Sequence, residues 1–96
     1  MRTYELMVIH RPDLSETDVQ SAVSDVEVAI SADGEVENRD LWGKRRFAYE
    51  INHLHEGYYS VVTFDAEEGP LVDALDRALS LSDTVIRHKV IRLGAA

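Results

Sequence analysis

The 96-residue sequence contains no cysteine, two prolines and one tryptophan. Without cysteine, disulfides and cysteine-ligated metal sites are excluded. No apolar run reaches the roughly 20 residues that a membrane-spanning helix requires, and the first residues lack the composition of a signal peptide. We therefore expect one domain over residues 1–96, in the cytoplasm, with no membrane partner.

Sequence motifs for catalysis are also missing. There is no Gly-rich phosphate loop and no nucleophile elbow. His53 and His55 form an H-x-H pattern. Because no third ligand follows at a useful spacing, we favour a structural or solvated role for both over metal binding. The sequence thus predicts no enzyme, no cofactor, no metal and no small-molecule substrate.

Basic residues are scarce and unevenly distributed. The chain has 10 Lys and Arg against 18 Asp and Glu, and its net charge is −8. A protein that binds nucleic acid alone is normally basic, so the placement of the charges matters. No Lys or Arg occurs between Asp13 and Glu37, and only Arg77 occurs between Asp65 and Asp83. We expect these two acidic segments to be largely helical.

Hydrophobic periodicity predicts six elements. The alternation of Tyr4, Leu6 and Val8 predicts a strand over 3–10 with these side chains on one face. Ser15 is a good N-cap, with Asp18 three residues later, for a helix of about four turns that Asp33 and Gly34 stop. A charged strand is expected over 35–51 with a bulge at Gly43, followed by a polar turn over 52–56 and a strand over 57–64. The second helix is expected from Pro70 to about Ser82, with an apolar stripe of Leu71, Val72, Leu75, Ala78 and Leu79. The last strand is expected over 84–93, before a tail from Gly94.

The order of these elements is β-α-β-β-α-β. This order predicts an α+β, ferredoxin-like split βαβ fold, with a four-stranded antiparallel sheet and two helices on one face.

The basic residues lie mainly on the predicted strands. Such a distribution allows a positive, RNA-facing strip on the sheet despite the negative total. Edge strands also carry Lys and Arg simply to prevent aggregation, and charge alone does not separate the two interpretations. Residues 57–64 weakly resemble an RNA-recognition strand, although one of Tyr58 and Tyr59 must point into the core and sheet packing is the default.

Several motifs together resemble the family of bacterial small-subunit ribosomal protein S6. They are residues 1–5 (MRTYE) with Pro12, residues 42–49 (WGKRRFAY) with Ile51, residues 56–59 (EGYY) and residues 84–88 (TVIRH). The resemblance covers essentially the whole chain in order. The chain departs from the family at Glu50, where many members have proline, and it stops at Ala96 without an acidic tail.

The resemblance implies a structural constituent of the small (30S) ribosomal subunit. Such a protein binds the central domain of 16S ribosomal RNA as a heterodimer with ribosomal protein S18, and a basic partner would explain the acidic composition. The residues expected to contact RNA or the partner are Arg2, Lys44, Arg45, Arg46, Arg87, Lys89 and Arg92. Candidates for packing or for contact with the partner are Tyr4, Trp42, Tyr49 and Tyr59.

Two alternatives remain open. One is a stand-alone RNA-recognition module in which Tyr58 or Tyr59 stacks on bases. The other is a ferredoxin-like domain that senses a small molecule, which would need a ligand pocket at a homodimer interface.

Overall fold

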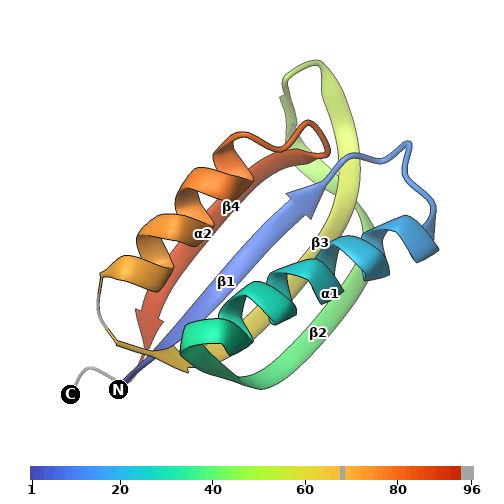
Figure 1. Cartoon of the computed structure of the whole chain (residues 1–96). Coiled ribbons are helices and arrows are strands. Elements are labelled where there is room, and N and C mark those ends of the chain that lie inside the picture. Colours follow the sequence, from blue (N-terminus) through green and yellow to red (C-terminus); the bar gives the residue numbers. More distant parts are fainter. Residues whose placement is uncertain (68, 94–96) are drawn as a thin grey trace.

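The computed structural model describes residues 1–67 and 69–93 (Figure 1). Its elements are β1 (Arg2–His10), α1 (Glu16–Asp33), β2 (Gly34–Ile51), β3 (Leu54–Ala66), α2 (Pro70–Ser80) and β4 (Val85–Leu93). The predicted β-α-β-β-α-β order is therefore confirmed. Glu68 and the predicted tail from Gly94 lie outside the described residues. Neither helix in the described part is both long and apolar enough to span a membrane.

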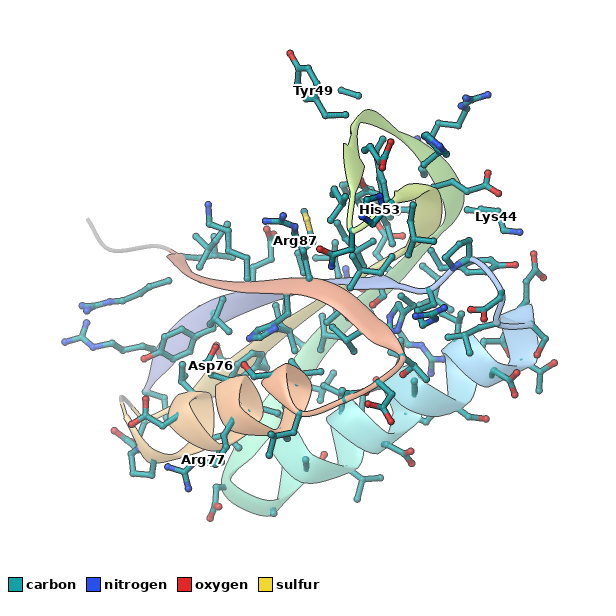
Figure 2. The ribbon with its side chains drawn as sticks, turned by 90° about the horizontal axis from the view of Figure 1, so that it is seen from above. Lys44, Tyr49, His53, Asp76, Arg77 and Arg87 are labelled. Atoms are coloured by element: carbon teal, nitrogen blue, oxygen red, sulfur yellow. The ribbon has the colours of Figure 1, made fainter. Side chains whose placement is uncertain are left out.

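The four strands form one antiparallel sheet in the order β2-β3-β1-β4. Both helices lie on the same side of this sheet, and the opposite side carries no helix (Figures 1 and 2). This arrangement is the predicted ferredoxin-like sandwich. β2 and β4 are the two edge strands, which matters for the site described below.

Alternating side chains build the core between sheet and helices. Tyr4, Leu6 and Val8 of β1 are at most 5% exposed, as their period of two predicts. Residues 71, 75 and 79 of α2 are buried against them, because a spacing of four keeps side chains on one helix face. Ala78 was predicted in this stripe but is exposed, since it lies beside the row of leucines rather than within it.

The beginning and end of α1 have different causes. The Ser15 hydroxyl oxygen caps the helix by accepting a hydrogen bond from the Asp18 backbone N–H at 3.1 Å. The Asp18 carboxylate in turn accepts from the Ser15 backbone N–H, so the predicted capping box is confirmed. The helix has 18 residues, or five turns rather than four. Gly34 then continues directly as extended backbone with φ −155°, so the predicted stop is not a left-handed cap. A Cβ at Gly34 would lie 2.5 Å from the Asp65 carbonyl oxygen, which explains the glycine.

β2 and β3 form a long hairpin that extends beyond the rest of the sheet (Figure 1). The predicted polar turn over 52–56 was too long, because β3 already begins at Leu54. Only Asn52 and His53 turn the chain, with φ values of 51° and 64°. Two positive φ values in a row match the right-handed twist of a hairpin. The predicted bulge at Gly43 is confirmed by a register shift between Leu41 and Gly43.

Candidate functional site

The side of the sheet that faces away from α1 and α2 is called the open face below (Figure 2). Residues that pair across strands project to the same side, and Met7 and Ile9 alternate with the core residues of β1. Lys89 of β4 pairs with Met7, while Arg87 and Tyr59 both pair with Ile9. These side chains therefore share the open face.

Of the three consecutive basic residues of β2, Lys44, Arg45 and Arg46, only Arg45 projects to the open face. Arg45 lies opposite Gly57, at an open-face position. Its guanidinium carbon lies 5.7 Å from the Trp42 ring centroid, and its Nε donates to the Trp42 carbonyl oxygen at 3.3 Å. Lys44 alternates to the helical side, where its Nζ lies 5.2 Å from the ring centroid of the buried Tyr58.

Trp42, Phe47 and Tyr59 form an aromatic corner beside these cations. The Trp42 and Tyr59 rings stack with centroids 5.9 Å apart and planes at 11°, and Phe47 meets Tyr59 edge-on at 6.2 Å. Trp42 Nε1 donates to Asp40 Oδ2 at 3.1 Å, which fixes the indole while leaving the residue 40% exposed. An arginine stacked on an exposed indole next to further aromatic rings is a surface suited to a nucleic acid or a protein partner.

The predicted basic strip is not continuous. β2 and β4 are opposite edges of the sheet, so residues 44–46 and 87–92 are separated by two strands, or roughly 14 Å at ordinary strand spacing. Of the seven predicted cations, the open face brings together Arg45, Arg87 and Lys89. Within residues 1–67 and 69–93, none of these three forms an ion pair. They remain available to an external anion.

The other predicted cations lie elsewhere. Arg2 pairs with Ala66 and Arg92 pairs with Tyr4, so strand alternation places both on the helical side, toward the end of the sheet opposite the hairpin. Arg46 faces Glu56 across the hairpin and alternates away from Arg45. The sequence could not distinguish these faces, because the distinction depends on register.

Arg39 and His88 also interact with the acidic helices. Arg39 Nη1 lies 3.0 Å from Glu27 Oε1 of α1, and His88 Nε2 lies 2.7 Å from Asp76 Oδ1 of α2. The positive charge of Arg39 is therefore directed at the helical layer of this chain rather than outward.

The four aromatic candidates separate in the same way. Tyr4 is 5% exposed and stacks on Phe64 with centroids 5.5 Å apart, so it is a core residue and cannot contact a partner in this structure. Tyr49 is 85% exposed and projects from the outer end of the hairpin (Figure 2). Phe47 was not predicted, although it shares the hairpin with Trp42 and its spacing gave no periodic signal.

The far end of the open face is acidic. Thr3 Oγ1 donates to Asp65 Oδ1 at 2.6 Å, and this bond holds the pKa of Asp65 below its usual value. Glu37 hydrogen-bonds to the same carboxylate, which raises the pKa of Glu37, and Glu5 belongs to the same end. The open face is thus polarised, with cations and aromatic rings toward the hairpin and carboxylates at the other end.

The H-x-H pattern lies at the tip of the hairpin. His53 Nδ1 lies 3.1 Å from Glu50 Oε1. Glu50 is the residue that stands where many family members have proline. In the described ranges, no group of three or more His, Asp or Glu side chains is arranged to hold a metal ion.

Comparison with known proteins gives one consistent result. The family model for ribosomal protein S6 matches residues 3–92. The chain is 48% identical over 94 residues to small ribosomal subunit protein bS6 of Symbiobacterium thermophilum, covering 96% of this chain and 97% of that protein. It is 46% identical to the bS6 protein of Streptomyces griseus, with 96% of each chain covered. The crystal structure of 30S ribosomal protein S6 from Thermotoga maritima superposes with a TM-score of 0.87 at 30% identity, covering 95% of this chain and 86% of that one.

Proposed function

The chain belongs to the ribosomal protein S6 family, and we propose that it is a non-enzymatic structural constituent of the bacterial small ribosomal subunit that binds 16S ribosomal RNA together with ribosomal protein S18. The observation that carries this proposal is the shared placement of Arg45, Arg87 and Lys89 on the open face. The aromatic corner lies in the same part of that face.

The charge distribution supports binding as a pair rather than alone. The chain has a net charge of −8, so an isolated copy is repelled by a polyanion at long range. A basic partner on the open face would offset that repulsion, and its docking would be guided by the acidic end around Asp65 and Glu37. The cations near the hairpin would then meet phosphate groups at the rim of the paired surface.

A reconstitution with purified components tests this proposal. We would measure the affinity of the chain for a central-domain fragment of 16S ribosomal RNA, with and without S18, over a series of salt concentrations. We expect binding to require S18. The Arg45→Gln, Arg87→Gln double variant should bind more weakly, with a salt slope that is smaller by about one for each phosphate contact removed.

Arg77→Gln is a control away from the open face, because Arg77 is an exposed arginine on α2, on the helical side (Figure 2). It removes one positive charge, so it is compared with the single variants Arg45→Gln and Arg87→Gln as well as with the double variant. It should bind like the unmodified chain. If the double variant and the control bind equally well, the open face is not the binding surface. If the chain binds RNA tightly without S18, a stand-alone RNA-recognition module is the better description.

A further inference from the structure

The bulge in β2 turns Arg45 toward the face that also carries Asp40. The two residues are five positions apart, so in a regular strand their side chains would project to opposite sides of the sheet. Asp40 pairs with Val61 and Arg45 pairs with Gly57, and these partners are four positions apart on β3, so they share one side. The extra residue lies at the bulge beside Gly43, whose φ is +81°. As a result, Asp40 and Arg45 line the same hollow in the surface.

Trp42 connects these two side chains. Its Nε1 donates to Asp40 Oδ2 at 3.1 Å, and its carbonyl oxygen accepts from Arg45 Nε at 3.3 Å. The guanidinium carbon of Arg45 lies 5.7 Å from the centroid of the same indole, within the range of a cation–π contact. Tyr59 stacks on the indole with centroids 5.9 Å apart. The indole is therefore held by Asp40 and Tyr59, and it in turn orients the guanidinium of Arg45.

The terminal nitrogens of Arg45 remain available for binding. Arg45 is exposed, and neither Nη1 nor Nη2 forms a hydrogen bond or an ion pair within residues 1–67 and 69–93. Because Nε is engaged by the Trp42 carbonyl oxygen, an anion meets the guanidinium end-on, at the two Nη atoms. Two parallel N–H donors match two oxygens of a phosphate group. A guanidinium that is already oriented also loses less conformational entropy when it binds.

We propose that Arg45 binds one backbone phosphate of the RNA end-on through its Nη atoms, and that Asp40 is a positioning residue that orients Arg45 through Trp42. This inference rests on the proposed function of the open face. The carboxylate of Asp40 repels a phosphate, so its charge opposes binding while its hydrogen bond to the indole favours it. Since the two effects have opposite signs, substitutions at Asp40 separate them.

Two neutral replacements of Asp40 distinguish the hydrogen bond from the charge. Asp40→Asn and Asp40→Ala remove the same negative charge, but only asparagine retains an oxygen that accepts from the indole N–H. Together with S18, the Asp40→Ala chain should bind the central-domain fragment of 16S ribosomal RNA about two- to tenfold more weakly than the Asp40→Asn chain does, the range that one hydrogen bond represents. In an Arg45→Gln background the two replacements should bind equally well.

The salt slope and the indole resonance are readouts that a change in stability alone would not move. Asp40→Ala should lower the salt slope toward that of Arg45→Gln, whereas Asp40→Asn should keep the native slope. Because Trp42 is the only tryptophan, its indole N–H gives a single cross-peak in a ¹H–¹⁵N spectrum of the free chain. This peak should move upfield and exchange faster with water in Asp40→Ala, and it should stay near its native position in Asp40→Asn.

Different results overturn this inference and the proposed function. If Arg45→Gln binds RNA more weakly but Asp40→Ala and Asp40→Asn bind alike, Asp40 does not position Arg45, and the proposed function stands. The same conclusion about Asp40 follows if Asp40→Ala loses as much affinity in the Arg45→Gln background. If Asp40→Ala instead weakens binding to S18 without RNA, Arg45 contacts the protein partner and not a phosphate. If Arg45→Gln binds RNA like the native chain, the RNA contact that the proposed function gives to Arg45 fails as well.

Discussion

His10 Nε2 lies 2.8 Å from Ser60 Oγ, and both residues are 1% exposed in the core beneath the helices. Burial lowers the pKa of His10 from 6.5 to about 4. The unfolded chain therefore takes up a proton at a higher pH than the folded chain does. The stability associated with neutral His10 is fully present above pH 6.5 and is lost as the pH falls toward 4.

We expect the free energy of unfolding to decrease by up to about 3 kcal/mol over this pH range because of His10, at 1.36 kcal/mol per pKa unit. Denaturant unfolding at several pH values measures the effect. Carboxylates also titrate near pH 4, so the informative quantity is the difference between the native chain and His10→Gln. If the two curves run parallel between pH 6.5 and 4, the ring is not held neutral by burial.

Gly34 and Gly43 should respond differently to substitution. Gly34 has an extended φ, and a Cβ there would meet the Asp65 carbonyl oxygen at 2.5 Å, so the obstacle is steric. Gly43 has a φ of +81° with no atom within 4 Å of an added Cβ, so the obstacle is conformational. Alanine should destabilise the chain by about 1–3 kcal/mol at Gly34 and by about 1–2 kcal/mol at Gly43.

Asparagine distinguishes the two causes. It adopts positive φ more easily than alanine, so Gly43→Asn should recover part of the lost stability. Gly34→Asn should be at least as destabilising as Gly34→Ala, because the larger side chain adds to the clash. Thermal denaturation of the four variants gives the comparison, and an equal benefit from asparagine at both positions would contradict it.

Tyr4 and Tyr49 test the separation of core and surface aromatic residues. Tyr4 is 5% exposed and stacks on Phe64, whereas Tyr49 is 85% exposed at the hairpin. Tyr4→Ala should lower the free energy of unfolding by about 3–5 kcal/mol, as truncation of a buried aromatic residue does. Tyr49→Ala should change it by less than about 0.5 kcal/mol. A small effect of Tyr4→Ala in chemical denaturation would show that the residue is not part of the core.

Sequence patterns predicted the elements because their signals are local. The alternation of Tyr4 with Leu6 predicted the buried face of the strand directly. This signal was more informative than the resemblance, which left Tyr4 as a candidate for either packing or partner contact. The capping box at Ser15 was likewise readable, since all its atoms belong to four consecutive residues. The hairpin turn was placed too broadly because Asn52 and His53 adopt positive φ without a glycine to mark it.

The candidate site was only partly predictable because it depends on long-range pairing. Arg45 and Arg46 are adjacent, and only register shows that Arg45 alone joins the open face. Arg87 shares that face although β2 and β4 are opposite edges, a relationship that sheet order determines. The basic residues were correctly assigned to strands, but β2 and β4 lack the apolar alternation of β1, so their sequences do not show which side is covered by helices.

Trp42 provides a direct optical test of docking on the open face. It is the only tryptophan of the chain and is 40% exposed, stacked on Tyr59. If S18 and the RNA fragment cover the aromatic corner, the indole is desolvated. Its emission should then move to shorter wavelength, and quenching by acrylamide should fall.

The Trp42→Phe variant, mixed with the same components, supplies the background emission of the partners and should be subtracted. Sedimentation establishes separately that the complex has formed under the conditions of the measurement. Unchanged emission and unchanged quenching in a sedimenting complex would mean that Trp42 stays in water. The partner would then have to bind elsewhere, and Arg45, whose guanidinium lies over the same indole, would be excluded from the interface with it.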